Sequence, residues 1–441
     1  MDVFRINGGV PLKGTVDASG AKNAALPIMA ASILADAPLT LSNVPDLADI
    51  NTLALLLGHL GVESKRDAAG DVRIATVDSL PTLAGNDLVG RMRASFCVLG
   101  PLLARRGRAI VALPGGCAIG ERPVDLHLKG LAALGAELRI EGGCVVARAM
   151  RLRGARISLA GPRGPTVTGT ANVMMAATLA SGQTTLTGAA CEPEIVDLGR
   201  FLNAIGAKIE GLGTSTIEIR GVEQLGGATH RLIPDRIEAA TLLIAAAMTR
   251  GAIQVRGVEP AHMTAVLDSL EAAGALLDVD GHHVAVAMSG PPRPLNVIAS
   301  PYPGTPSDLQ PQLTALAALA TGTSRLIDRV FPERFQHLRE LERLGARIER
   351  CGNRITVVGA PALDGGDVTG PDLRGGTALV LAGLAAHGRT LVRRVDHIDR
   401  GHERLDAKLK QLGARIERFA DEESRQQSLM IMTEAIESAT A

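Results

Sequence analysis

The sequence predicts an α/β protein built from six repeated units of about 70 residues, grouped as two bodies of three. At 441 residues the chain is too long for one ordinary hydrophobic core. A helix-ending turn with a central glycine also recurs at an almost constant spacing, which indicates internal repeats. The six glycines are Gly61, Gly135, Gly206, Gly274, Gly345 and Gly413.

The order of elements within a unit is constant. Each unit is expected to contain an Ala/Leu-rich helix, a short strand, a polar loop, a second amphipathic helix, the glycine turn and a further strand. In the third unit we expect helices at 170–179 and 196–205, a loop at 190–195 and strands at 184–186 and 207–210. Other alternating stretches predict strands at 73–77, 138–140, 216–219 and 354–358.

The break between the two bodies is expected near residues 230–234. We therefore predict one three-repeat domain at 22–232 and a second, discontinuous one formed by 1–21 and 233–419. The segment 420–441 follows the sixth repeat and is expected to be an appended helix or tail.

Composition narrows the classes of function. Lysine plus arginine equal aspartate plus glutamate at 46 each, and tryptophan is absent, so neither a nucleic-acid partner nor an anionic membrane is expected. The amino terminus lacks the pattern of a secretory signal, and no apolar run suffices for a membrane span, which favours the cytoplasm. The histidines are dispersed and the cysteines lack Cys-x-x-Cys spacing, so no metal or other cofactor is expected. A buried, apolar role is expected for each of the cysteines except Cys117.

Several cations stand at or just before predicted helix starts, at equivalent points of the repeat. Helix amino termini already carry partial positive charge, so basic residues there imply a bound anion. Arginine forks match both phosphate and carboxylate, which predicts a ligand carrying both groups. The cations are Lys22, Arg93, Arg122, Arg334, Arg374 and Arg400.

The stretch 113–127 contains the candidate reactive group. Gly115 and Gly116 precede Cys117, and Arg122 follows it before a helix start. A thiol beside a cation and a helix amino terminus has a lowered pKa and can act as a nucleophile or proton donor. We expect this stretch to be a mobile lid that carries the thiol to the substrate. Asp308 is the candidate acidic partner, with a helix-capping role as the alternative.

The stretches 19–25, 91–95, 113–127, 234–239, 372–374 and 397–401 resemble the enolpyruvyl transferases. They are most similar to the UDP-N-acetylglucosamine branch, which opens peptidoglycan synthesis, and the resemblance extends from about residue 4 to 419. It implies two inside-out α/β domains that close over phosphoenolpyruvate and a UDP-sugar. It also implies protonation of the phosphoenolpyruvate methylene, addition of the sugar 3-hydroxyl and elimination of phosphate.

The resemblance also assigns expected roles to residues of this chain. Cys117 matches the proton donor that fosfomycin alkylates, Asp308 the acceptor of the hydroxyl proton, and Lys22 and Arg400 further catalytic cations. The expected phosphoenolpyruvate contacts are Lys22, Asn23, Arg122, Arg334, Arg374 and Arg400. The expected UDP-sugar contacts are Asn23, Arg93, Arg122, Pro123, Val124, Asp125, Leu126, Asp308 and Val330.

Some positions depart from the usual pattern of that family, which leaves the acceptor open. They are Gly164, Ala171, Thr305, Gly375 and His402, the last of which replaces a common tyrosine. One alternative is a related transferase acting on another nucleotide hydroxyl. The other is a non-catalytic protein that senses nucleotide sugars.

Overall fold

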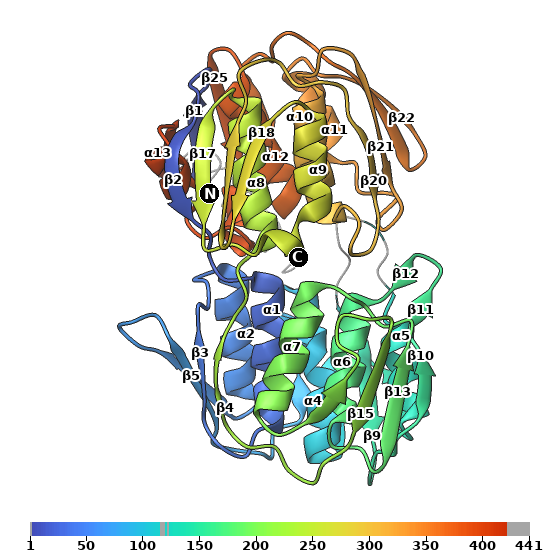
Figure 1. The fold of residues 1–441 in the computed structure, drawn as a ribbon. Coiled ribbons are helices and arrows are strands. Elements are labelled where there is room, and N and C mark those ends of the chain that lie inside the picture. The colour runs from blue at the N-terminus through green and yellow to red at the C-terminus, as the bar shows by residue number, and fades with distance from the viewer. Residues whose placement is uncertain (1, 115–119, 121–122, 421–441) are drawn as a thin grey trace, which may run out of the picture.

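The chain forms two lobes that are stacked end to end (Figure 1). The computed structural model describes residues 2–114, 120 and 123–420. The core of the first lobe draws on residues 21–232, and that of the second combines residues 4–16 with 237–416. The predicted domain boundaries remain a proposal. Ala420 pairs with Asp2, and the rest of the predicted tail, 421–441, lies outside the described residues.

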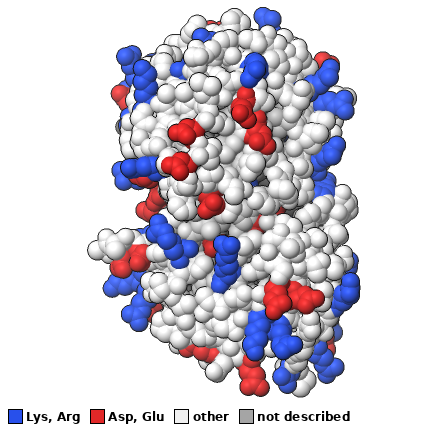
Figure 2. Space-filling model, viewed as in Figure 1, with Lys and Arg blue, Asp and Glu red and all other residues white. Residues whose placement is uncertain are grey.

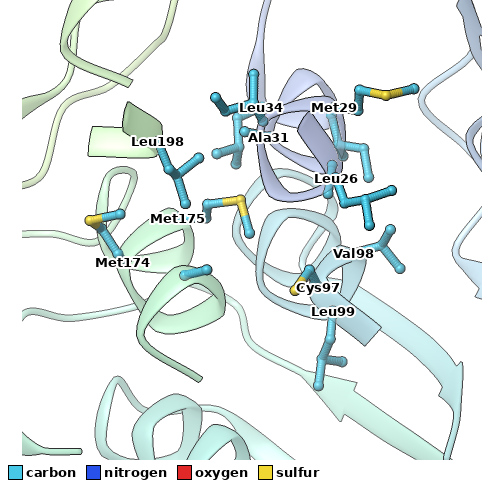
Figure 3. Close-up of a cluster of buried hydrophobic side chains, with 14 of the residues drawn as sticks. Leu26, Met29, Ala31, Leu34, Cys97, Val98, Leu99, Met174, Met175 and Leu198 are labelled. Carbon is cyan, nitrogen blue, oxygen red and sulfur yellow. The ribbon is translucent and has the colours of Figure 1, made fainter. Parts of the chain in front are cut away.

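Three largely buried helices form the centre of each lobe. Most of their residues are buried, as a helix surrounded by protein requires, although a few such as Arg105 are exposed. In the first lobe, side chains such as Leu26, Cys97 and Met175 meet between these helices (Figure 3). The central helices are α1 (Lys22–Ala31), α4 (Leu99–Arg106) and α6 (Val167–Ala177), then α8 (Arg236–Met248), α10 (Gln310–Ala317) and α12 (Leu373–Ala385).

Each of the six repeated glycines ends an amphipathic helix. All six have φ between 73° and 112°, a left-handed conformation that favours glycine. The turn after the third of these helices is closed by Ala207, whose N–H donates to the carbonyl of Leu202 at 2.9 Å. The helices are α2 (Ala48–His59), α5 (Asp125–Ala133), α7 (Pro193–Ala204), α9 (Thr264–Ala272), α11 (His337–Arg343) and α13 (Leu405–Gln411).

Six four-stranded sheets of one topology surround the central helices, so these helices lie inside and the sheets outside (Figure 1). In each sheet the first two strands are parallel and the remaining pairs antiparallel. In the first lobe the orders are β16 (Thr229–Arg231), β3 (Leu39–Ser42), β5 (Val72–Thr76), β4 (Val62–Arg66); β6 (Leu83–Ala84), β7 (Arg108–Ala112), β9 (Cys144–Arg148), β8 (Glu137–Glu141); and β10 (Arg156–Ser158), β13 (Gln183–Thr187), β15 (Thr216–Arg220), β14 (Lys208–Glu210).

The second lobe repeats this arrangement with strands from both ends of the described chain. Its sheets are β2 (Lys13–Asp17), β17 (Ala252–Arg256), β19 (His283–Ala287), β18 (Leu276–Asp280); β20 (Asn296–Ala299), β21 (Thr323–Asp328), β23 (Arg354–Val358), β22 (Arg347–Cys351); and β24 (Asp367–Thr369), β25 (Arg389–Arg393), β1 (Asp2–Asn7), β26 (Arg415–Ala420). Short elements complete the fold: β11 (Ala160–Gly161), β12 (Gly164–Pro165), α3 (Asn86–Val89) and the 3-10 helices η1 (Ser32–Leu34), η2 (Arg93–Val98), η3 (Pro260–His262), η4 (Ser307–Leu309) and η5 (Val395–Arg400).

The six-unit α/β prediction is confirmed. In the third unit the expected strands become β13, β15 and β14, and the expected helices become α6 and α7, each shifted by one to three residues. The shift of α6 follows from Thr166, whose side chain accepts the N–H of Gly169 and starts the helix before residue 170.

The chain crosses between the lobes twice, and the two crossings pair with each other. Ala21 N–H donates to the carbonyl of Ile233 at 2.8 Å, and Asp235 N–H to that of Ser19 at 2.8 Å. Nearby, the carboxylate of Glu194 in the first lobe receives two hydrogen bonds from Arg236 in the second, at 3.0 and 3.2 Å. The lobes are thus joined by backbone and side-chain contacts at the crossing.

The surface shows both signs of charge on both lobes (Figure 2). Within the described ranges, no helix is long and apolar enough to cross a membrane.

Candidate functional site

Asp308 lies between two buried arginines of the second lobe. Its carboxylate accepts Arg334 Nη1 at 2.7 Å and Arg374 Nη2 at 3.0 Å. The Asp308 side chain is 30% exposed, whereas those of the arginines are 4% and 2% exposed. Burial alone would raise the pKa of Asp308, but Arg374 and Arg334 outweigh it and hold this pKa far below its usual value. Asp308 is therefore a carboxylate, and the alternative of a helix cap is wrong, because neither η4 nor α10 has a side-chain cap.

Local structure explains how these arginines are held. Asp372 caps α12 by accepting the N–H groups of Arg374 and Gly375, which fixes the first turn that carries Arg374. The same carboxylate lies 3.7 Å from Arg334 Nη2. The carbonyl of Ser307 also accepts Arg334 Nη1, at 3.3 Å. Both guanidinium groups are thus oriented by neighbours before any ligand binds.

These predicted cations stand at helix starts or a few residues before them. Lys22 and Arg374 occupy the first turns of α1 and α12. Arg334 precedes α11 by three residues, and Arg400 ends η5, five residues before α13 begins. The loops before these second helices form turns of their own, so their cations reach the site from loop backbone.

Lys22 and Arg400 share a carboxylate that the sequence did not reveal. Asp49 Oδ2 lies 2.6 Å from Lys22 Nζ, and Asp49 Oδ1 accepts Arg400 Nε at 2.9 Å. Arg400 belongs to the second lobe and Asp49 to the first, so this ion pair crosses the gap between the lobes. Burial, opposed by Asp49 and assisted by Arg374 and Arg400, lowers the pKa of Lys22. An acidic residue in the first turn of a helix is common because it interacts favourably with the helix dipole. For this reason the sequence alone did not single out Asp49.

The two cation groups lie close to each other. The charges of both Arg374 and Arg400 act on Lys22. His402, buried with 1% exposure, contacts Arg374 through its ring at 3.2 Å. The structure therefore brings together four of the predicted cations with Asp308, around a junction of both lobes.

The remaining predicted residues fall into smaller groups. Arg93 Nη2 donates to the carbonyl of Pro123 at 3.1 Å, which joins the start of η2 to the segment before α5. Val330 is half-buried, and its N–H donates to Asp328, whose other oxygen accepts Ser307 Oγ. The other described members lie at or near the surface: Asn23 and Asp125 are exposed, and Val124 and Leu126 are half-buried.

Cys117 and Arg122 lie outside the described residues, as do residues 115–119 and 121 of the predicted lid. The described Gly120 lies close to the second lobe, because a Cβ added there would be 3.1 Å from the carboxylate of Glu333. Among the other cysteines the expected burial is right for Cys97 and wrong for Cys351, which is exposed at the end of edge strand β22.

Two arginine nitrogens of the site are buried without an acceptor among the described residues. Arg334 Nε and Arg374 Nε are enclosed yet lack a hydrogen-bond partner within the part of the chain that the structure describes. Because an unpaired buried donor is costly, both N–H groups favour an anionic ligand. In that same part, no group of three or more histidine, cysteine, aspartate or glutamate side chains is arranged to hold a metal ion.

Comparisons with known proteins match nearly the whole chain. The family described as "EPSP synthase (3-phosphoshikimate 1-carboxyvinyltransferase)" matches residues 6–422. The chain belongs to the EPSP synthase family. It is therefore a transferase of the carboxyvinyl type, with the enolpyruvyl transferase fold.

Two curated relatives within this family are named UDP-N-acetylglucosamine 1-carboxyvinyltransferase. The one from Anaeromyxobacter sp. (strain K) is 52% identical over 423 residues, 95% of this chain and 99% of the relative. The one from Methylacidiphilum infernorum (isolate V4) is 47% identical over 418 residues, with the same coverage.

Solved structures of EPSP synthase family members agree with the fold. The enolpyruvyl transferase NikO from Streptomyces tendae has a TM-score of 0.86 and 28% identity, covering 95% of this chain and 99% of that one. An EPSP synthase from Acinetobacter baumannii has a TM-score of 0.73 at 20% identity, covering 95% of this chain and all of the other, and at that identity supports the fold alone.

Proposed function

We propose that this EPSP synthase family member transfers the enolpyruvyl group of phosphoenolpyruvate to the 3-hydroxyl of UDP-N-acetylglucosamine. The observation that carries the proposal is the ionised Asp308 between Arg334 and Arg374, beside Lys22 and Arg400. This arrangement offers a proton acceptor next to cations that suit a substrate with one carboxylate and one phosphate. The 52% identical relatives that carry this activity in their name support the same acceptor.

The proposed reaction is an addition followed by an elimination. A proton from Cys117 adds to the methylene carbon of phosphoenolpyruvate while the sugar 3-oxygen bonds to the central carbon. The hydroxyl proton passes to Asp308. In the elimination, the Cys117 thiolate takes back a proton from the new methyl group while the bond from the central carbon to the phosphate oxygen breaks. The enol ether remains, and phosphate leaves with the proton that Asp308 had accepted.

The ion pairs of Asp308 with two arginines imply that the carboxylate of phosphoenolpyruvate adjusts the pKa of Asp308. While Arg374 and Arg334 both bond to Asp308, its pKa is too low for efficient proton acceptance. A substrate carboxylate on the unpaired Nε atoms shares the charge of both arginines. Its negative charge raises the pKa of Asp308 toward the usual range, so that proton acceptance is coupled to binding.

Lys22 and Arg400 are proposed to hold the phosphate, together with Arg122. Asp49 forms ion pairs with both Lys22 and Arg400. A phosphate dianion bound between Lys22 and Arg400 would form ion pairs with both lobes, as Asp49 does in the structure. Asn23, Arg93 and Val330, with Pro123, Val124, Asp125 and Leu126, are the proposed UDP-sugar contacts. A cytoplasmic location belongs to the same proposal.

The experiment measures phosphate release from phosphoenolpyruvate with three acceptors: UDP-N-acetylglucosamine, UMP and shikimate 3-phosphate. We expect release with the first only. Release with UMP alone would favour the alternative that acts on another nucleotide hydroxyl. No release with any acceptor would contradict both enzymatic functions and favour a nucleotide-sugar sensor.

A further inference from the structure

His402 contacts Arg374 at the edge of the site. Its Nε2 lies 3.2 Å from Arg374 Nη1, and both side chains are almost completely buried. The residue follows η5, and its own N–H donates to the carbonyl of Ile398, so the ring approaches Arg374 from a segment that also carries Arg400.

The contact defines the protonation state of the ring. A guanidinium group has only donors, so the hydrogen bond forms only if His402 Nε2 is an acceptor. The ring is therefore neutral, with its hydrogen on Nδ1, which is itself buried and without a partner among the described residues. Burial first, then the charges of Arg374, Lys408 and Lys22, lower the pKa of His402 well below its ordinary value, while Asp308 opposes them. The electrostatics thus agree with the geometry.

The acceptor determines where Arg374 can point. Nη2 donates to Asp308 at 3.0 Å and Nη1 to His402, which fixes the plane of the guanidinium at two corners. Nε, on the remaining edge, is buried without a partner among the described residues. Without the acceptor on Nη1, the group could rotate about its last bonds and offer a second N–H to Asp308 instead of to a ligand.

We propose that His402 is a positioning residue, whose neutral ring holds Arg374 so that one guanidinium serves both Asp308 and the carboxylate of phosphoenolpyruvate. This inference rests on the proposed function and adds a residue that acts through Arg374. The required feature is the acceptor and its reach, and the aromatic ring itself is not required.

Replacing His402 by glutamine or by asparagine tests whether the distance that the acceptor reaches matters, because both side chains are polar amides but differ in length. The terminal amide of His402→Gln can place its oxygen near the position of Nε2, whereas that of His402→Asn reaches only the position of Nδ1. We expect His402→Asn to raise the KM for phosphoenolpyruvate about tenfold, as loss of an acceptor to a charged donor implies. Its kcat and its KM for UDP-N-acetylglucosamine should stay within about threefold. His402→Gln should remain within about threefold of the wild type in all three constants.

The comparison is made at matched thermal stability, with His402→Leu replacing His402→Asn if the shorter amide does not fold. Equal constants for the two amide variants, or a loss in kcat with an unchanged KM for phosphoenolpyruvate, would overturn the inference. An inactive wild type in the same assay would instead refute the proposed function, so the two failures are distinguishable.

Discussion

Asp49 and Arg400 form an ion pair between the lobes, with Arg400 Nε 2.9 Å from Asp49 Oδ1. The other oxygen of the same carboxylate holds Lys22, so one acidic side chain compensates two cations on opposite sides of the junction. Removing it leaves the charge of Lys22 buried without compensation.

Replacement of Asp49 should therefore be costly. We expect Asp49→Asn to lower the free energy of unfolding by about 3 kcal/mol, the range found when one partner of a buried ion pair is removed. Urea unfolding at neutral pH measures this. The matched control is Asp46→Asn in the same segment, where the exposed side chain contacts Asn51 and the change should stay below about 0.5 kcal/mol. Equal effects of the two substitutions would contradict a special role for Asp49.

The stability of the protein should depend on pH through His337. Burial lowers the pKa of this residue to about 3, whereas an unfolded histidine has a pKa of about 6.5. Between these values the unfolded chain binds a proton that the folded chain does not, so stability falls as pH falls, by up to about 1.4 kcal/mol per pH unit. Above about pH 6.5 the contribution is complete.

Comparing the pH dependence of stability between the wild type and a variant separates the contribution of His337 from those of the other titrating groups. Urea unfolding of the wild type and of His337→Leu at pH 7, 6 and 5 should show that the difference in stability shifts in favour of the variant at lower pH. Parallel curves for the two proteins would show that His337 does not titrate in this way.

The repeated glycine turns make a prediction about backbone conformation. Gly206 has φ of 112° with open space around an added Cβ, so Gly206→Ala should destabilise by about 1 to 2 kcal/mol through backbone strain alone. Gly58 lies within α2 and also has open space. Gly58→Ala should stabilise by about 0.5 to 1 kcal/mol, because alanine favours the helix. Opposite signs in chemical denaturation are the expected result, and the same sign for both would exclude conformational strain as the cause.

The thiol prediction concerns inactivation by fosfomycin. We expect time-dependent inactivation of the wild type in the presence of the UDP-sugar, and its loss in Cys117→Ser. Cys351→Ser is the control, because that thiol is exposed on a sheet edge and its removal should leave the inactivation rate unchanged. Continued inactivation of Cys117→Ser would identify another target.

Features set by local chemistry could be predicted from the sequence. The glycine turns are such a feature, because a helix end that needs positive φ selects glycine wherever the chain places it. The closure of the sheets is not local: β16 pairs with β3, so that Thr229 lies beside Thr40, and no pattern within either strand encodes its partner. The roles of Asp49 and His402 are hidden for the same reason, since each depends on residues that are distant in sequence.

The cation cluster shows a similar division. The lysine and arginines of the sequence predicted a bound anion. They did not predict that Asp308 and Asp49 form ion pairs with these cations within the protein. A substrate carboxylate or phosphate must therefore compete with Asp308 and Asp49 for these cations.

Tyr302 lies at the junction of the lobes, where its N–H donates to Glu192 and its ring faces the guanidinium of Arg236. It is the single tyrosine of a chain without tryptophan. Nearly all near-ultraviolet absorption above the phenylalanine bands, and the emission that follows it, therefore arise from one ring between the two lobes. The protein therefore carries an optical probe of the junction between its lobes, which can be read without a dye or an added label.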